Sequence, residues 1–397
     1  MTLASSLGLL SSFAHPTARS DQRADVFSRT PQLGMVALAC LVLLASCGDD
    51  DSPGGKTAVD PSTVGQVGDA ASAGDAASAG DAGLPPGECT VGDTKPCTTF
   101  ITPTGTRVPL GPYGARADVN VGKGFENVVQ SGDQPNNPTT CKAFSSIFQE
   151  DPKLTEQLLM TTVNGLTIDF SLYSVYRPAE WKAGETYPVL TWGNGTCAQP
   201  EGYGALLRYV ASAGYVVIAA NSRWVGAGSP APMLHALDFA AAANADPTSP
   251  YYQKLDLTKV GAMGHSQGGG ATAAASTDPR ISSVIIFNAG NVDLQKPFLS
   301  ISGDADIAGF TPASMAAAIG ASTVPSAFLY YHNPAGMGSI KGHLVLMLSP
   351  DRVTGPTVGW FNVTLRKDAE SRSWFDGASC KLCNQAAVFE FGQHLLQ

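Results

Sequence analysis

Charged side chains are scarce in this chain of 397 residues. Only 14% of the residues are Asp, Glu, Lys or Arg, whereas an average globular protein has about 25%. Basic residues are the rarer kind, 24 against 33 acidic ones, so that the formal net charge is −9. Such a chain has little attraction for nucleic acid or for an anionic membrane surface. Clusters of His, Cys and Asp with the spacing of metal ligands are also missing, and we therefore expect neither a metal ion nor an organic cofactor.

The apolar run near the N-terminus, MVALACLVLLAS (Met35–Ser46), is short. A membrane-spanning helix needs about 20 apolar residues, so this run fits the core of a signal peptide instead. It ends in LLASC, and its last four residues, Leu44 to Cys47, resemble the lipobox of bacterial lipoproteins. The resemblance implies that residues 1–47 form a signal peptide, that Cys47 is lipidated, and that the protein is anchored at the outer membrane or cell surface. An ordinary secretory signal is the alternative.

Aromatic residues are absent from residues 48–88, which are rich in Gly, Ala, Ser and Asp and contain an imperfect GDAASA repeat. Because such a segment cannot bury enough apolar surface to offset the entropy lost on ordering, we expect a disordered tether. The remaining residues, 89–397, number roughly 300, which is near the upper limit for one hydrophobic core. We therefore expect one folded domain, and a monomer.

Six cysteines follow the lipobox, and an even number in an exported chain favours disulfide bonds. Their pairing is open, because six cysteines allow 15 combinations. The last two could instead form a redox or metal pair, but no second Cys-x-x-Cys or redox pattern accompanies them, so a structural bridge is the better hypothesis. The one in the GNGTCA loop is expected to stiffen that loop. The six are Cys89, Cys97, Cys141, Cys197, Cys380 and Cys383.

Short apolar runs alternate with helical patterns beyond residue 165. The run LTIDFSLYSVYRP alternates with period two, which favours an antiparallel strand. Strands buried on both faces are predicted for YPVLTWG, GYVVIAAN, KVGAMGH, SSVIIFN, KPFLSISG and SAFLYYHN. Helices are predicted for YGALLRYVASAG, PMLHALDFAAAANA, GGGATAAAS and PASMAAAIGA. This alternation predicts an α/β fold with a mostly parallel, doubly wound sheet and a site beyond the carboxyl ends of its strands.

The segment VGAMGHSQGGGAT places Ser266 between a predicted strand and a predicted helix. A serine at such a junction sits on a sharp turn that crowds the residues two before and two after it, which explains Gly264 and Gly268. The turn exposes the hydroxyl at a helix N-terminus, where developing negative charge is favoured. Ser266 is therefore the candidate nucleophile.

A serine hydroxyl needs a base and an acid that orients the base. In a hydrolase of the predicted α/β type these residues follow the serine in the order acid, histidine. His343, after a Gly-rich loop, is the preferred base, and His332 at the end of an aromatic strand is the alternative. His394 is close to the C-terminus, and His265, the neighbour of the serine, is expected to point the other way.

The remaining parts of the site belong to two further loops. In SGDADIA we prefer Asp306 to Asp304 as the acid, because the loop must clear the strand before it turns back towards the histidine. The oxyanion needs two backbone N–H donors. One is expected from Gln267, and the other from Asn194 or Thr196 in GNGTCA, with Thr196 preferred.

From about Leu166 onward the chain resembles the α/β-hydrolases, in particular the cutinase-like and dienelactone-hydrolase-like branch that includes bacterial poly(ethylene terephthalate) hydrolases. The resemblance is carried by YPVLTWGNGT, ALLRYVASAGYVVIAAN, GHSQGGG followed by TDPRISSVIIF, SGDADIA and the late Gly-His pair. It implies an α/β-hydrolase fold in which Ser266 is the nucleophile, Asp306 the acid and His343 the base. It also implies that Thr196 and Gln267 supply the two oxyanion donors.

Two positions depart from the polyester hydrolases. Those enzymes have an aromatic residue, usually Trp, after the strand that matches SSVIIFN, where this chain has AGNVD. The loop after YPVLTWG carries Thr196 in place of Tyr or Phe. The resemblance therefore does not extend to cleavage of aromatic polyesters. Only AGNVDLQ separates SSVIIFN from KPFLSISG, which leaves no room for a lid domain and predicts an open cleft.

These patterns predict a serine hydrolase that cleaves carboxylic esters, polymeric ones among the candidates, outside the cytoplasm. A carbohydrate or feruloyl esterase, or a peptidase, is the alternative on the same fold. A surface-binding lipoprotein that has lost turnover is a third hypothesis. In each case the membrane is contacted only through the N-terminal lipid.

Overall fold

The computed structural model describes most of the chain beyond residue 86, namely residues 87–102, 105–130, 160–163, 166–196, 198–221, 230–290, 294–332, 342–383, 385 and 388–396. All of them belong to the second of two compact units, Val64–Gln397. The predicted signal peptide, its Cys47, the predicted tether up to residue 86, and the cysteines Cys141 and Cys197 lie outside the described residues. No helix in the described ranges is long and apolar enough to cross a membrane.

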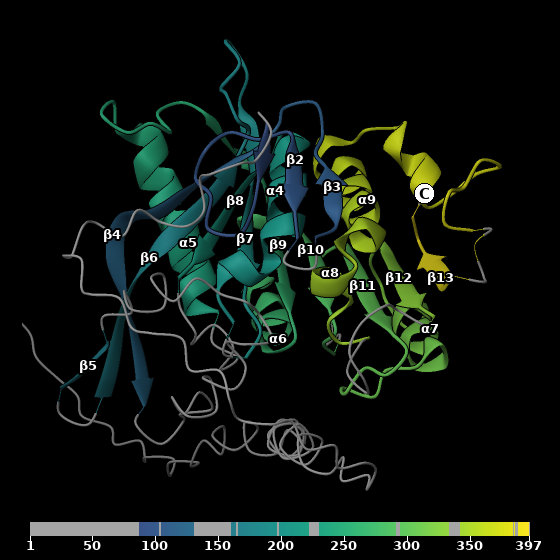
Figure 1. Ribbon diagram of the computed structural model, residues 1–397. Coiled ribbons are helices and arrows are strands. Elements are labelled where there is room, and N and C mark those ends of the chain that lie inside the picture. Colours follow the sequence, from purple (N-terminus) through teal and green to yellow (C-terminus); the bar gives the residue numbers. More distant parts are fainter. Residues whose placement is uncertain are drawn as a thin grey trace, which may run out of the picture. The chain divides into compact units, whose positions relative to one another are not determined.

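A large sheet forms the centre of this unit (Figure 1). It has ten strands in the order β13-β12-β11-β10-β9-β7-β8-β6-β4, with β5 paired to β6. The strands are β4 (Arg116–Gln130), β5 (Met160–Val163), β6 (Leu166–Arg177), β7 (Tyr187–Gly193), β8 (Val216–Ala220), β9 (Leu255–His265), β10 (Ile281–Phe287), β11 (Phe298–Gly303), β12 (Ser326–Tyr331) and β13 (Phe389–His394).

The sheet is mixed, and the parallel arrangement predicted from the sequence is found in its central strands. Strands β8, β7, β9, β10, β11 and β12 pair in parallel. Strands β4, β5 and β6 are antiparallel to their partners on one side, β6 also to β8, and β13 is antiparallel to β12 on the other. The central strands are buried on both faces, which explains their continuous apolar sequences. The flanking strands have more mixed sequences, which indicate a strand less clearly.

Side chains alternate between two apolar clusters, one on each face of the sheet. On β7, Leu190 and Trp192 join one cluster while Val189 joins the other, and β10 repeats the pattern with Ile285 and Ile286. Helices α5 (Ala231–Ala245), α6 (Gln267–Ala275) and α7 (Pro312–Gly320) cover the second face. The first face is covered by α4 (Gly204–Ser212), α8 (Val345–Leu348) and α9 (Pro350–Phe361). Shorter helices are η1 (Pro200–Tyr203), η4 (Asn362–Arg366) and η5 (Ser371–Trp374).

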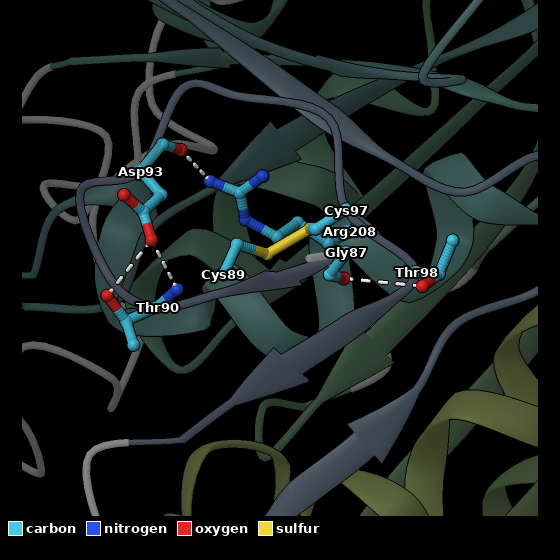
Figure 2. The surroundings of a disulfide bond; sticks show 7 residues. All are labelled: Gly87, Cys89, Thr90, Asp93, Cys97, Thr98 and Arg208. Carbon is cyan, nitrogen blue, oxygen red and sulfur yellow. Dashed lines mark hydrogen bonds between the residues drawn. A yellow bond between two sulfur atoms is a disulfide. The ribbon is translucent and has the colours of Figure 1, made fainter. Parts of the chain in front are cut away.

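A second sheet of three strands, β1 (Glu88–Cys89), β2 (Thr99–Ile101) and β3 (Arg107–Pro109), contacts helix α4. The disulfide Cys89–Cys97 joins the end of β1 to the segment before β2 (Figure 2). The buried Arg208 of α4 donates to the carbonyl oxygen of Asp93 in the loop that this disulfide closes. The guanidinium also lies over the ring of Phe100. The disulfide loop is thus attached to helix α4 through a buried guanidinium group.

Trp374 holds the segment after α9 against that helix. An added Cβ at Gly355 or Gly359 would come within 2.5 Å or 2.9 Å of the indole ring, so these two glycines make room for it. Leu382 donates its N–H to the carbonyl of Trp374, next to the second disulfide, Cys380–Cys383. The Cys-x-x-Cys pair is therefore a disulfide that closes a turn beside the aromatic ring.

Candidate active site

Ser266 lies on the turn between β9 and α6, at φ 54° and ψ −121°. A positive φ is unfavourable for a residue with a side chain, and the surrounding backbone holds it in place. The Ser266 N–H donates to the carbonyl of Phe287 at 2.8 Å. A Cβ at Gly264 would overlap the carbonyl oxygen of Gly268, and a Cβ at Gly268 would overlap the carbonyl oxygen of Gly193. The two glycines thus permit a backbone crossing that no larger residue allows.

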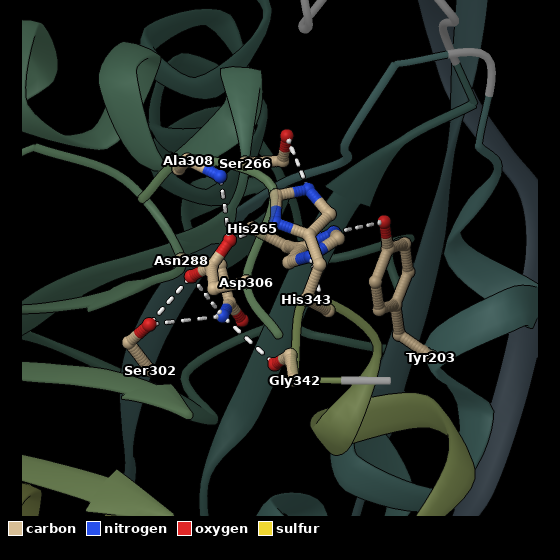
Figure 3. Close-up of polar contacts among 9 residues, drawn as sticks. All are labelled: Tyr203, His265, Ser266, Asn288, Ser302, Asp306, Ala308, Gly342 and His343. Atoms are coloured by element: carbon tan, nitrogen blue, oxygen red, sulfur yellow. Dashed lines mark hydrogen bonds and ion pairs between the residues drawn. The ribbon is translucent and has the colours of Figure 1, made fainter. Parts of the chain in front are cut away.

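His343 lies directly beside this serine, in the turn before α8 (Figure 3). Its Nε2 is 2.9 Å from Ser266 Oγ. The residue is 8% exposed, which leaves an edge of the ring accessible while its position is fixed by packing. Ser266 and His343 are 77 positions apart in the sequence, so only the fold brings them together.

Asp306 completes the row on the other side of the imidazole. Its Oδ1 accepts from His343 Nδ1 at 2.7 Å and from the N–H of Ala308 at 2.9 Å. Its Oδ2 accepts from Asn288 Nδ2 at 2.8 Å and from Ser302 Oγ at 2.5 Å. Burial by itself would raise the pKa of this carboxyl, but the hydrogen bonds and the charge of His343 outweigh it and lower the pKa to about 2. Asp306 is therefore ionised and fixed in orientation.

The two alternative candidates from the sequence pair with each other instead. His332 Nδ1 is 3.4 Å from Asp304 Oδ2, and its Nε2 is 3.2 Å from Glu390 Oε1 on β13. This group lies at the edge of the sheet formed by β12 and β13. The hydroxyl of Ser266 instead lies 2.9 Å from Nε2 of His343, whose Nδ1 is paired with Asp306, so the geometry favours His343 and Asp306.

The loop after β7 lies next to the turn that carries Ser266. One of the two oxyanion donors is expected from this loop. The side chain of Asn194 is fully buried and points inward, because it accepts from Trp192 Nε1 and donates to the carbonyl of Ala220. Thr196 is partly exposed. Gln267 is the first residue of α6, and the N–H groups of a first helical turn have no acceptor within the helix. Thr196 and Gln267 remain the preferred donors.

Four residues of the site were not found from the sequence. Asn288 and Ser302, which bind Asp306, lie at the carboxyl ends of β10 and β11, where the strand-end rule for α/β sheets could have drawn attention to them. Asn288 also donates to the carbonyl of Gly342, at 3.0 Å. Tyr203 and His265 form hydrogen bonds that reach His343 from the opposite side (Figure 3). No local pattern marks that pair.

In the described ranges, no group of three or more His, Cys, Asp or Glu side chains could hold a metal ion. The arrangement can instead transfer a proton from a serine hydroxyl to an imidazole held by a carboxylate. Residues 158–325 match the model of the family described as PET hydrolase-like.

This segment is similar to the PET hydrolase-like family. The family indicates an ester hydrolase of the α/β-hydrolase fold. The match includes Ser266, Asp306 and the loop with Thr196, whereas His343 lies beyond its last residue, so the PET hydrolase-like segment receives its imidazole from a later part of the chain. No curated protein matches the sequence.

Proposed function

We propose that this PET hydrolase-like protein is a serine esterase that cleaves carboxylic esters, polyesters included, through an acyl-enzyme. The observation that carries the proposal is the row Ser266 Oγ to His343 Nε2, 2.9 Å, and His343 Nδ1 to Asp306 Oδ1, 2.7 Å. These are hydrogen-bond distances at which proton transfer requires no rearrangement.

In the first half of the reaction, Ser266 Oγ attacks the ester carbonyl carbon while its proton passes to His343 Nε2. The carbonyl oxygen gains negative charge, which the N–H groups of Thr196 and Gln267 would bind. The carbon–oxygen bond to the alcohol then breaks, and His343 returns the proton to the leaving alcohol. The acyl group remains on Ser266.

In the second half, His343 takes a proton from water, whose oxygen attacks the acyl carbon. The acid product leaves and the proton returns to Ser266. Throughout the cycle Asp306 stays ionised and stabilises the imidazolium, which agrees with its pKa of about 2.

We further propose that the enzyme is anchored by a lipid at Cys47 and that it acts outside the cytoplasm. The support for this location is the sequence LLASC and the six cysteines that follow it. Because the chain departs from the polyester hydrolases at AGNVD and Thr196, the preferred class of ester is to be measured with a substrate panel. The panel should include p-nitrophenyl butyrate, a feruloyl ester, an aliphatic polyester and poly(ethylene terephthalate).

Replacement of the nucleophile tests the proposal directly. We expect Ser266→Ala to lower kcat on p-nitrophenyl butyrate by about 10⁶-fold, because the attacking oxygen is gone. It should also abolish labelling by a fluorophosphonate probe. Ser276→Ala is the matched control, since Ser276 caps the same helix and its hydroxyl bonds only to Ala273. A Ser266→Ala enzyme with undiminished turnover, or a wild-type protein that the probe does not label, would contradict a serine mechanism.

A further inference from the structure

His265, the residue before the nucleophile, is packed against the catalytic imidazole. It is 2% exposed, and the centroids of the rings of His265 and His343 are 4.8 Å apart. His265 Nε2 lies 2.7 Å from the backbone carbonyl oxygen of His343. The sequence had suggested only that His265 turns away from the site. The structure instead places it in contact with the base.

On its other side, His265 contacts the loop that carries the expected oxyanion donor. His265 Nδ1 is 3.0 Å from Tyr203 Oη, and Tyr203 Oη is 3.0 Å from the backbone nitrogen of Gly195. Tyr203 is the last residue of η1 and is 1% exposed. Gly195 stands between the two candidate donors, Asn194 and Thr196. One chain of hydrogen bonds therefore runs from this loop to His343.

The chemistry of these groups fixes the direction of every hydrogen bond. A carbonyl oxygen only accepts, so His265 Nε2 carries a proton. Burial, followed by the charge of His343, lowers the pKa of His265 to about 3, so the ring is neutral and Nδ1 is an acceptor. Tyr203 must then donate its hydroxyl proton to Nδ1, and its oxygen accepts from the N–H of Gly195. Every donor in this chain of hydrogen bonds therefore faces an acceptor.

Gly195 lies so close to this pair that only glycine fits. A Cβ there would be 2.7 Å from His265 Nδ1 and 2.9 Å from Tyr203 Oη. The N–H of Gly195 is occupied by Tyr203, so it is not the donor that faces a substrate. The adjacent N–H of Thr196 is thereby positioned by the contact without taking part in it.

We propose that Tyr203 and His265 are positioning residues that hold the oxyanion loop at Gly195 and the backbone of His343 in one fixed relation. The inference rests on the proposed esterase function and adds to it a dependence of proton transfer on this buried pair. Neither side chain touches substrate. Their effect is that the donor for the carbonyl oxygen and the imidazole for the attacking hydroxyl are both aligned before the substrate arrives.

Removal of one hydroxyl group tests the coupling. We expect Tyr203→Phe to lower kcat on p-nitrophenyl butyrate by about 10- to 100-fold with KM changed by less than about threefold, because alignment is lost while binding is kept. Tyr215→Phe is the matched control, since Tyr215 is equally buried in the same apolar cluster and donates to Asn362, away from the site. It should lose comparable thermal stability and keep its kcat. Equal kcat values for the two variants would overturn the proposal.

A double variant separates a coupled pair from two independent effects. His265→Gln keeps an amide donor for the carbonyl of His343 and should retain more activity than His265→Leu. If Tyr203 and His265 act as one unit, Tyr203→Phe combined with His265→Gln should cost no more than the larger single effect. Fold losses that multiply would show that the two residues act separately, against the proposal.

A measurement on the wild-type protein covers the case in which a variant does not fold. In ¹⁵N-histidine NMR spectra, His265 should remain a neutral ring with its proton on Nε2 from about pH 8 to about pH 4. A proton on Nδ1, or titration near neutral pH, would overturn the proposal. Activity that survives Ser266→Ala would instead remove the esterase function itself, whereas a Ser266-dependent enzyme unaffected by Tyr203→Phe would remove only the coupling.

Discussion

Two buried side chains of the site have opposite preferences for charge. Asp306 accepts four hydrogen bonds and keeps its carboxylate ionised, with its pKa lowered to about 2. His265 is fully enclosed, and burial lowers its pKa to about 3, so that it stays neutral. His343, between them, contacts both. In the proposed mechanism, His343 is accordingly the one of these three groups that accepts the proton of Ser266.

Because His265 is neutral in the folded protein, the free energy of unfolding is expected to change with pH in the mildly acidic range. Its pKa is lowered from an ordinary value of 6.5 to about 3 on folding, so between these limits the unfolded chain binds a proton that the folded chain does not. Stability from this group is therefore complete above about pH 6.5 and is lost as the pH falls, at about 1.4 kcal/mol per pH unit. The groups that face the ring are Tyr203, His343 and Asp306.

Urea denaturation at several values between pH 7 and pH 4 measures this dependence. We expect the free energy of unfolding to fall more steeply with acid in the wild type than in His265→Gln, by up to one proton equivalent. Asp306 contributes in a separate window, from about pH 4 down to about pH 2, because its folded pKa is also lowered. Parallel curves for the two proteins would show that His265 titrates normally in the folded state.

At the scale of elements, the junction of β9 and α6 is held by backbone atoms. Gly268 in the first turn of α6 lies against the carbonyls of Gly193 and Asn194, at the end of β7. Those carbonyls cannot rotate aside as a side chain could. The position of the oxyanion loop is therefore set by how closely a helix and a strand end can approach each other.

Gly268→Ala should disturb this approach. The added methyl group has to displace the loop after β7, and we expect kcat to fall by about 10²-fold and stability to fall by about 1–3 kcal/mol. Gly270→Ala is the control on the same helix, because a Cβ at Gly270 meets nothing within 4 Å. It should keep full activity and gain up to about 1 kcal/mol from helix propensity. Kinetic assays and thermal unfolding of both variants distinguish the two effects.

The central elements were predictable and the peripheral ones were not, for physical reasons. Strands β7, β8, β10, β11 and β12 and the second half of β9 are buried on both faces, so they leave short apolar runs in the sequence. Helix α9 contains Gly355, Pro356 and Gly359, which locally favour a loop, yet it forms because Trp374 packs onto its glycines. In the site, Ser266 and its glycines form a local pattern. The contacts of His265 with Tyr203 and His343 span 62 and 78 positions, and no window of sequence shows them.

At the scale of the whole folded unit, the small sheet of β1, β2 and β3 is attached to α4 through the Cys89–Cys97 loop and Arg208. The bridge closes a loop over a sequence separation of 8, which in the chain-entropy model stabilises the folded state by about 2–3 kcal/mol. The disulfide Cys380–Cys383 spans a separation of only 3 and is expected to contribute less.

We therefore expect the double variant Cys89→Ser with Cys97→Ser to unfold at a lower guanidinium concentration. Its free energy of unfolding should be smaller by about 2–3 kcal/mol. The kcat at 25 °C should stay within about threefold of wild type, because neither cysteine contacts the catalytic row. Cys380→Ser with Cys383→Ser provides the comparison and should lose less stability. A larger loss from the C-terminal bridge would contradict the expectation that the longer loop contributes more.

The close approaches at Gly195, Gly264 and Gly268 also bear on attempts to change what this enzyme accepts. All three positions are occupied by backbone passing within contact distance of backbone or of a buried ring, so a mutagenesis library that varies them would consist mostly of inactive members. Diversity is better introduced at Thr196 and Ala289, which are partly exposed and beside the elbow. Side-chain changes at these positions keep the backbone N–H of Thr196, so selectivity can be altered while the proposed oxyanion donor is retained.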